Sequence, residues 1–254
     1  MKLISSVSIR YVLPIVSIVM MFLFPCLTNA AIQIPQGLNS LQREEALKIL
    51  GFGMSEKIMT DPYPLGGYSG VEVGLSVETI PTQDLGRLGN KLESPQQNVT
   101  IPKLTIGKGL YNNVDIFFSF TPYNKQDEIS QYGSLVRWTF LQPEKLPATV
   151  SVTTYFNSVN VSNKVKATSL GTDLIAGISV EDVSLFAGYG FLKSYGSFLG
   201  GNEGVTSSSD IETANVGGNH SLVGATIHMA NVVITAQLDR YTQTVFSAKL
   251  ALRF

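Results

Sequence analysis

The chain has 254 residues, of which 44% are hydrophobic and 15% are charged, and its formal net charge is -1. This balance lacks the basic excess of a nucleic-acid-binding protein, and one cysteine excludes a disulfide scaffold within the chain. The charged fraction lies below the roughly 25% of soluble globular proteins, yet after residue 30 no apolar run is long enough to span a bilayer as a helix.

Residues 1–30 have the layout of a secretory signal peptide. Lys2 and Arg10 precede a long apolar stretch that contains no acidic residue and ends in small residues. We expect cleavage after Ala30; a retained membrane anchor and lipidation at Cys26 are the alternatives. Cleavage would remove the only cysteine and two basic residues, leaving 16 basic against 19 acidic residues and a net charge of -3.

Residues 31–68 do not follow a strand pattern. Asn39 and Gln42 have the spacing of a capping pair, good helix formers follow, and Gly51 supplies a stop signal. The sequence therefore predicts a short amphipathic helix over Leu41–Leu50. Two placements fit this segment equally well: packed on the periplasmic rim of the next domain, or inserted in its lumen as a plug.

From Ser69 to Phe254 the apolar residues alternate with polar ones, which is the period of a strand with two different faces. The last segment is the clearest, since Phe246, Leu250, Leu252 and Phe254 all fall on one face. The alternation predicts ten strands, over residues 71–78, 103–106, 114–121, 136–140, 150–157, 169–178, 184–191, 223–229, 232–239 and 244–254.

The connections between these strands differ in length. Short turns are expected near residues 112–113, 142–144, 181–182 and 230–231, and long polar loops over 80–98, 123–130, 158–168 and 193–219. Short turns that alternate with long loops are typical of outer-membrane barrels. A soluble antiparallel sandwich is the alternative, and twelve strands result if residues 55–68 or 193–219 contain another hairpin.

Residues 69–254 resemble the bacterial outer-membrane β-barrel proteins of the small porin-like type, through their alternation and the terminal aromatic Phe254. The resemblance implies an all-β fold, a transmembrane antiparallel up-and-down barrel of about ten strands, in the outer membrane of a Gram-negative bacterium. It also implies contact with outer-membrane lipid, and assembly by periplasmic chaperones and the insertion machinery. That machinery would read Phe246, Leu250, Leu252 and Phe254 as the C-terminal insertion signal.

The polar face of the strands should line the lumen of such a barrel. Its charged and histidine members are Glu72, Glu78, Lys103, Asp115, Arg137, Asp173, His228, Asp239, Lys249 and Arg253. Five acids against four bases is nearly balanced, whereas an ion-selective pore would be expected to carry a ring of one sign. We therefore expect ion pairing across a narrow lumen.

Catalytic groupings are scarce in this sequence. The two histidines, His220 and His228, lack metal-ligand spacing, and His220 is expected at a loop edge. Gly217 and Gly218 are expected to lie in a flexible loop. We expect no enzyme, no catalytic residues, no cofactor and no metal site.

Two functions remain open on the sequence. The first is a narrow channel for small or amphipathic solutes, gated or occluded by the N-terminal segment, with the solute unknown. The second is a non-transporting barrel with a structural or adhesin-like role, which acts through residues 80–98 and 193–219.

Overall fold

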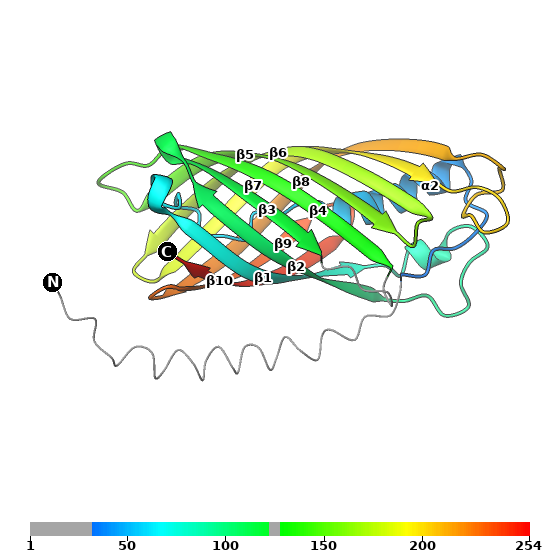
Figure 1. The fold of residues 1–254 in the computed structure, drawn as a ribbon, viewed down its shortest axis with the longest axis horizontal. Helices are drawn as coiled ribbons and strands as arrows, with labels where there is room; N and C mark the ends of the chain where they lie inside the picture. Colours follow the sequence, from blue (N-terminus) through cyan, green and yellow to red (C-terminus); the bar gives the residue numbers. More distant parts are fainter. Residues whose placement is uncertain (1–31, 122–127) are drawn as a thin grey trace.

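The computed structural model describes residues 32–121 and 128–254, so the expected signal peptide, residues 1–30, lies outside the described part of the chain. Ten antiparallel strands form a closed barrel in which β1 pairs with both β2 and β10 (Figure 1). They are β1 (Val71–Pro81), β2 (Asn98–Gly109), β3 (Val114–Thr121), β4 (Ile129–Leu141), β5 (Ala148–Val161), β6 (Val165–Val180), β7 (Val183–Phe198), β8 (Glu212–Met229), β9 (Val232–Arg240) and β10 (Thr244–Arg253). The predicted ten-stranded barrel is confirmed, and neither 55–68 nor 193–219 adds a hairpin.

The two ends of the barrel have different connections. One end, the turn end, carries the C-terminus and the connections 110–113, 142–147, 181–182 and 230–231. The opposite end, the loop end, carries residues 82–97 and 199–211, which are the longest connections. Outer-membrane barrels place short turns in the periplasm and long loops outside, so we expect the turn end to be periplasmic and the loop end to be external.

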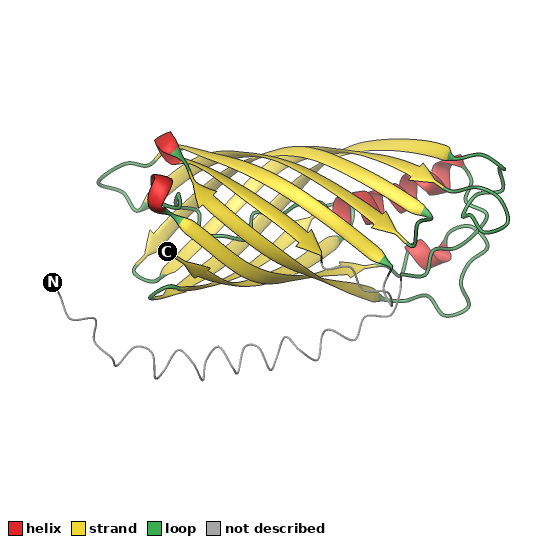
Figure 2. Ribbon diagram, in the orientation of Figure 1, coloured by secondary structure: helices red, strands yellow, loops and turns green. Residues whose placement is uncertain are grey.

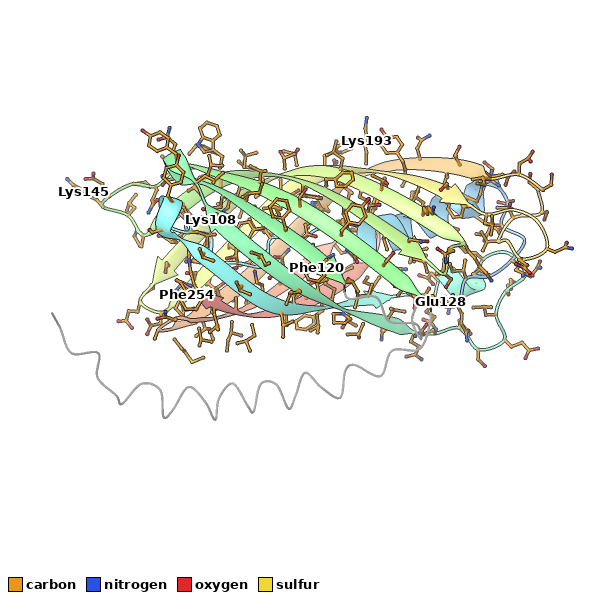
Figure 3. The ribbon with its side chains drawn as sticks, in the orientation of Figure 1. Lys108, Phe120, Glu128, Lys145, Lys193 and Phe254 are labelled. Atoms are coloured by element: carbon orange, nitrogen blue, oxygen red, sulfur yellow. The ribbon has the colours of Figure 1, made fainter. Side chains whose placement is uncertain are left out.

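The outer face of the strands carries an apolar belt. Its members are exposed although they are large and hydrophobic: Phe118, Phe120, Val136, Leu170, Leu174, Ile178, Leu185, Phe191, Val223, Ile227, Leu238 and Phe246 among others. Figure 3 labels two of the exposed aromatic side chains, Phe120 of β3 and Phe254 at the C-terminus. A continuous exposed apolar surface of this kind is stable when lipid covers it.

Two predicted loops were wrong. Residues 158–168 form the upper parts of β5 and β6, joined by residues 162–164, and residues 193–219 contain the upper parts of β7 and β8. Only 199–211 connect β7 to β8, so Gly217 and Gly218 lie within a strand. Strands β6, β7 and β8 have 16, 16 and 18 residues, and they rise above the apolar belt at the loop end.

The alternation of these strands reverses above the belt, which explains the error. Here the inward residues are apolar and buried, as at Val165, Leu192 and Phe198. The outward residues are polar, as at Lys166 and Lys193. The reversal follows from the surroundings, because the upper strands face water outside and a packed helix inside.

That helix belongs to the N-terminal segment. Helix α2 spans Ser40–Leu47 and continues as one π-helical turn, η2 (Lys48–Phe52), close to the predicted Leu41–Leu50. The capping pair is present: the Gln42 backbone N–H donates to Asn39 Oδ1 at 3.0 Å and the Asn39 N–H donates to Gln42 Oε1 at 3.1 Å. Figure 2 shows the helix within the strands at the loop end. Short 3-10 turns are η3 (Gly67–Ser69), η4 (Leu85–Arg87) and η5 (Tyr111–Asn113).

Removing this cap should weaken the attachment of the helix. For Asn39→Ala we expect a loss of about 1 kcal/mol in the free energy of unfolding, because the Gln42 N–H loses its acceptor. Urea titration of the folded fraction in detergent micelles measures the loss. Asn39→Ser keeps an oxygen acceptor and should remain near the wild type, and equal stability of the alanine and serine variants would contradict the role of the cap.

Candidate functional site

The lumen is occupied by residues 46–65, which we call the plug segment. It begins at the end of α2, near the loop end, and runs down to Leu65, six residues before β1 begins at the turn end. Nearly all of its side chains are buried. Because these residues precede β1 directly, the barrel closes around the segment that leads into its own first strand.

The loop-end half of the plug segment forms an apolar core with the wall. Leu47, Leu50, Phe52 and Met54 are buried in one hydrophobic cluster with inward-facing residues from seven strands. These wall residues are Ile80, Val99, Ile101, Ile129, Val159, Val161, Val165, Ala167, Leu192, Phe198 and Val216. Glycine in the wall makes room for the helix, since a Cβ at Gly196 would lie 2.8 Å from Leu47 Cδ1.

The middle of the plug segment is held by charges. Glu78 of β1 accepts from Lys57 Nζ at 3.0 Å and from Lys103 Nζ at 2.7 Å. Glu56 accepts from the Ser119 hydroxyl at 2.6 Å and lies 3.9 Å from Lys103 Nζ. The four charged side chains are buried, so each one depends on the others for compensation.

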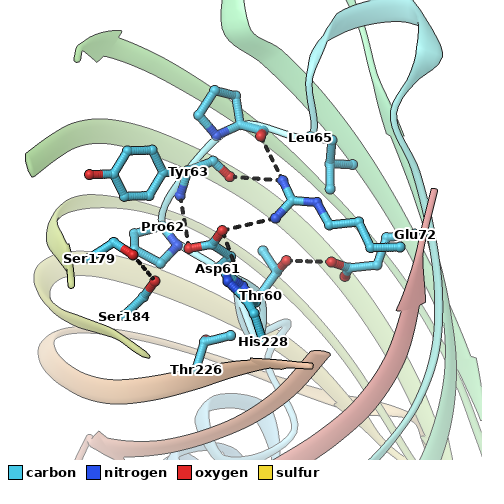
Figure 4. Close-up of polar contacts among 12 residues, drawn as sticks. Thr60, Asp61, Pro62, Tyr63, Leu65, Glu72, Ser179, Ser184, Thr226 and His228 are labelled. Atoms are coloured by element: carbon cyan, nitrogen blue, oxygen red, sulfur yellow. Dashed lines mark hydrogen bonds and ion pairs between the residues drawn. The ribbon is translucent and has the colours of Figure 1, made fainter. Parts of the chain in front are cut away.

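Near the turn end, the plug segment is bound to β1 and β10 (Figure 4). Thr60 donates to Glu72 Oε2 at 2.7 Å, and Lys249 donates to the other oxygen of Glu72 at 2.6 Å. Asp61 Oδ2 accepts from Arg253 Nη1 at 2.9 Å and lies 3.3 Å from His228 Nε2. Arg253 also donates to the carbonyl oxygens of residues 63 and 64.

Arg137 is among the largest fully buried side chains of the described chain and joins the wall to the plug segment. Its Nε and Nη2 donate to Asp115 Oδ2 at 3.0 and 2.7 Å. It also donates to the backbone carbonyls of Asp61 and Tyr63. The second oxygen of Asp115 accepts from the Leu65 N–H at 3.0 Å. The pair therefore binds three backbone positions of the plug segment.

A further polar cluster lies on the wall from β5 to β8 and includes Tyr241, in the turn after β9. His220 Nε2 lies 2.8 Å from Asp173 Oδ1 and 3.3 Å from the Tyr155 hydroxyl. The His220 ring stacks on Tyr241, and the Tyr241 hydroxyl shares a 2.9 Å hydrogen bond with Ser55. Burial raises the pKa of the Tyr241 hydroxyl well above its ordinary value, so it stays protonated.

Glycine is required where this cluster crosses β7. A Cβ at Gly190 would lie 2.0 Å from Asp173 Oδ1, so only a bare backbone there lets Asp173 reach His220 on the next strand but one. His220 was expected at a loop edge; it is instead a buried wall residue of β8. Its alternation with the inward-facing Leu222 was the signal that could have found it.

The predicted lumen residues all lie on the inner wall. Eight are buried, and His228 and Arg253 are partly exposed at the turn end. Their ion pairs do not cross a narrow lumen as expected. They join neighbouring strands, as in Glu78–Lys103 and Asp115–Arg137, or join the wall to the plug segment, as in Arg253–Asp61. Asp239 accepts from Gln237 on its own strand. The C-terminal residues Phe246, Leu252 and Phe254 are exposed on the outer face.

Residues 32–121 and 128–254 contain neither a membrane-spanning helix nor a group of metal ligands. None of the helices there has the length and hydropathy to cross a membrane. No three of the histidine or acidic side chains in that part of the chain are grouped so that they could hold a metal ion.

A closed antiparallel sheet with an apolar exterior and a polar or packed interior defines the class of transmembrane β-barrels of the outer-membrane type. No family model and no curated protein matches the sequence. Solved structures with a similar fold include several outer-membrane barrels.

The attachment invasion locus protein Ail of Yersinia pestis is 15% identical over 73% of this chain and 97% of its own, with a TM-score of 0.30. The N-terminal β-barrel domain of Pseudomonas aeruginosa OprF is 11% identical over 74% and 99%, with a TM-score of 0.33. The Escherichia coli outer membrane protease OmpT is 8% identical over 73% and 96%, with a TM-score of 0.38. At these identities and TM-scores the likenesses carry no information about the site.

Proposed function

We propose that the protein is a closed, non-conducting outer-membrane barrel that binds a partner at the cell surface through its loop end. The observation that carries the proposal is the plug segment, whose loop-end half forms a continuous apolar core with the barrel wall. A lumen filled in this way offers no path for a solute. The proposal takes the surface-binding alternative of the two that the sequence leaves open.

The chemistry of the upper wall favours a permanent plug. If α2 left the lumen, inward residues such as Ile101, Leu192 and Phe198 would face water. Each fully buried apolar side chain of this size is stabilised by about 1.5–3 kcal/mol relative to an exposed one. A wall built for a water-filled pore would carry polar groups at these positions.

Backbone hydrogen bonds also hold the loop end together. The Leu38 N–H donates to the Val205 carbonyl at 2.9 Å, and the Asn90 N–H donates to the Gln36 carbonyl at 2.8 Å. These bonds tie the N-terminal residues to both long connections, 82–97 and 199–211. With the raised strands β6 to β8, they give the outside of the barrel a fixed surface, which suits recognition.

A gated channel is the second candidate, and one observation favours it. The turn-end half of the plug segment, residues 55–65, is held mainly by ion pairs and hydrogen bonds, such as Lys57–Glu78 and Asp61–Arg253. Water can replace such bonds at a lower cost than it can replace an apolar core. In this alternative the plug segment would have to leave its apolar contacts when the channel opens.

Ion conductance in a planar bilayer separates the two candidates. We expect the refolded chain of residues 31–254 to insert without steady conductance and without voltage-dependent opening. A chain that begins at residue 61 lacks α2 and the apolar half of the plug segment, and is the matched comparison for an unblocked lumen. Steady or voltage-dependent conductance from the longer chain would overturn the closed barrel and favour the channel.

A further inference from the structure

Strand β8 extends further toward the loop end than its neighbour β9. Strand β8 pairs with β7 from Glu212, opposite Phe198, to Ile227, opposite Val183. Its pairing with β9 begins only at Ser221, opposite Arg240. Residues 212–220 of β8 therefore have a strand on one side and an open edge on the other.

The register identifies the backbone groups at this edge. The His228 N–H donates to the Asp182 carbonyl, on the β7 side, at 2.8 Å. The β7–β8 register is unbroken from there to residue 212, so the even-numbered residues of β8 bond to β7. The N–H and C=O groups of the odd-numbered residues Thr213, Asn215, Gly217 and Asn219 point the other way, to the open edge.

The described chain leaves these groups without partners. Within residues 32–121 and 128–254, no backbone or side-chain hydrogen bond reaches them. Helix α2 lies against β8, but its polar contact there is between the side chains of Arg43 and Glu212. Natural sheets protect long exposed edges with proline, lysine or bulges, and residues 212–220 contain none of these.

The open edge lies in water at the external end. On the outer face of β8 the apolar belt includes Val223 and Ile227, whereas the outward residues above it are polar, such as Asn215 and Asn219. A strand added to the edge would continue the line of β9 beyond Arg240, over the turn that joins β9 to β10. The added strand would not contact lipid.

A groove of about 250 Å³ lies at that turn. Thr242 and Gln243 of the turn, Glu45, Lys48 and Ile49 of the helix, and Arg87 are among its lining residues. Glu45 and Lys48 supply one acidic and one basic group, neither of which has a hydrogen-bond or ion-pair partner in the described chain. An added strand that carries basic and acidic side chains on its inward face would therefore find an oppositely charged partner for each in Glu45 and Lys48.

We propose that residues 212–220 form a docking edge for an extended peptide segment of an external partner, which adds to β8 as a further strand. The inference rests on the proposed surface-binding function and names the chemistry of its partner. Backbone hydrogen bonds to the four odd-numbered residues would give affinity, and the groove would select side chains.

A second copy of this chain does not fit the edge. Copies in one membrane have β8 rising in the same direction, so a two-fold axis along the membrane normal makes the two strands cross at about twice their tilt, roughly 70–90°. Strands that cross so steeply cannot form a ladder. The occupant is therefore a flexible segment that can align itself with β8.

The probe is a fluorescein-labelled eight-residue peptide, Thr-Lys-Thr-Glu-Thr-Lys-Thr-Glu, whose anisotropy is measured with the chain of residues 31–254 in micelles. We expect saturable binding, and at least about tenfold weaker binding to the variant that combines Asn215→Pro and Gly217→Pro, because proline removes N–H groups at the open edge only. Asn215→Ser keeps the N–H group and should bind like the wild type.

A second comparison does not depend on the folding of the proline variant. Two peptides of the same sequence carry N-methyl groups on alternate residues, one set odd and the other even. Pairing through one edge requires that only one of the two peptides loses binding. Equal binding of both, or no binding by the wild type at about 1 mM peptide, overturns the docking edge. Either result leaves the closed barrel untouched, since that claim rests on conductance.

Discussion

Replacing Arg137 by methionine is expected to lower the free energy of unfolding by about 3–5 kcal/mol, because it leaves the buried carboxylate of Asp115 without its cation. The substitution also removes the donors to the backbone carbonyls of Asp61 and Tyr63. We therefore expect the turn-end half of the plug segment to lose protection from hydrogen exchange. Urea titration in micelles measures the first effect, and amide exchange measures the second.

Two variants control for this prediction. Arg240→Met removes an exposed arginine whose side chain bonds to Thr244, and should change stability by less than about 0.5 kcal/mol. Combining Arg137→Met with Asp115→Leu removes both charges and should restore part of the loss. Similar stability of the wild type and Arg137→Met would contradict a buried ion pair at this position.

Replacing Phe52 by alanine should cost about 3–5 kcal/mol, since this ring is buried in the apolar core between the plug segment and the wall. Its ring lies 6.2 Å from the Tyr241 ring between centroids, and a Cβ at Gly218 of β8 would lie 3.1 Å from Phe52 Cε2. The cavity cannot close easily, because the closed sheet fixes the wall around it. Urea titration and the loss of amide protection in α2 are the two measurements.

Leu41→Ala is the matched control for the loss of a large apolar side chain from the same segment. Leu41 is 76% exposed on α2, so its truncation should change stability by less than about 0.5 kcal/mol. If Phe52→Ala were as stable as Leu41→Ala, the helix would not be packed in the lumen.

Sequence periodicity predicted the barrel but not the height of its wall. Within the apolar belt, lipid faces one side and polar lumen groups face the other, so residues such as Leu170 and Leu174 alternate clearly with polar neighbours. Above the belt the same alternation continues with its sense reversed, as at Val165, Lys166 and Ala167. The outward residues there are polar, so a prediction based on outward apolar residues assigns 158–168 and 193–219 to loops.

The reversed alternation above the apolar belt also indicates that the lumen there is filled by an apolar element. Inward apolar residues on β5 to β8 need an apolar partner inside the barrel, and Leu47 and Leu50 of the N-terminal segment provide it. Sequence alone did not connect the two, because the pairing joins residues more than a hundred positions apart. The placement of the segment therefore depends on tertiary contacts that no local pattern encodes.

The lumen residues were predictable as a set, but their partners were not. Alternation places Glu72, Glu78 and Arg137 on the inner wall. Their partners on the plug segment, Lys57 and Asp61 among others, lie outside any strand, so no spacing rule reaches them. The expectation of pairing across a narrow lumen was wrong because a third element, the plug segment, fills the space between the walls.

A disulfide between the plug segment and the wall tests most directly whether the plug segment is seated in the lumen. A Cβ at Gly53 would lie 3.9 Å from the Ile80 Cβ, within the range of about 3.5–4.5 Å that disulfides span. The only cysteine of the chain is Cys26, which the chain of residues 31–254 lacks. We predict that the variant with Gly53→Cys and Ile80→Cys folds with a wild-type yield and forms the bond quantitatively, as read by mass spectrometry. Folded protein with both thiols free and reactive would contradict a plug segment seated in the lumen.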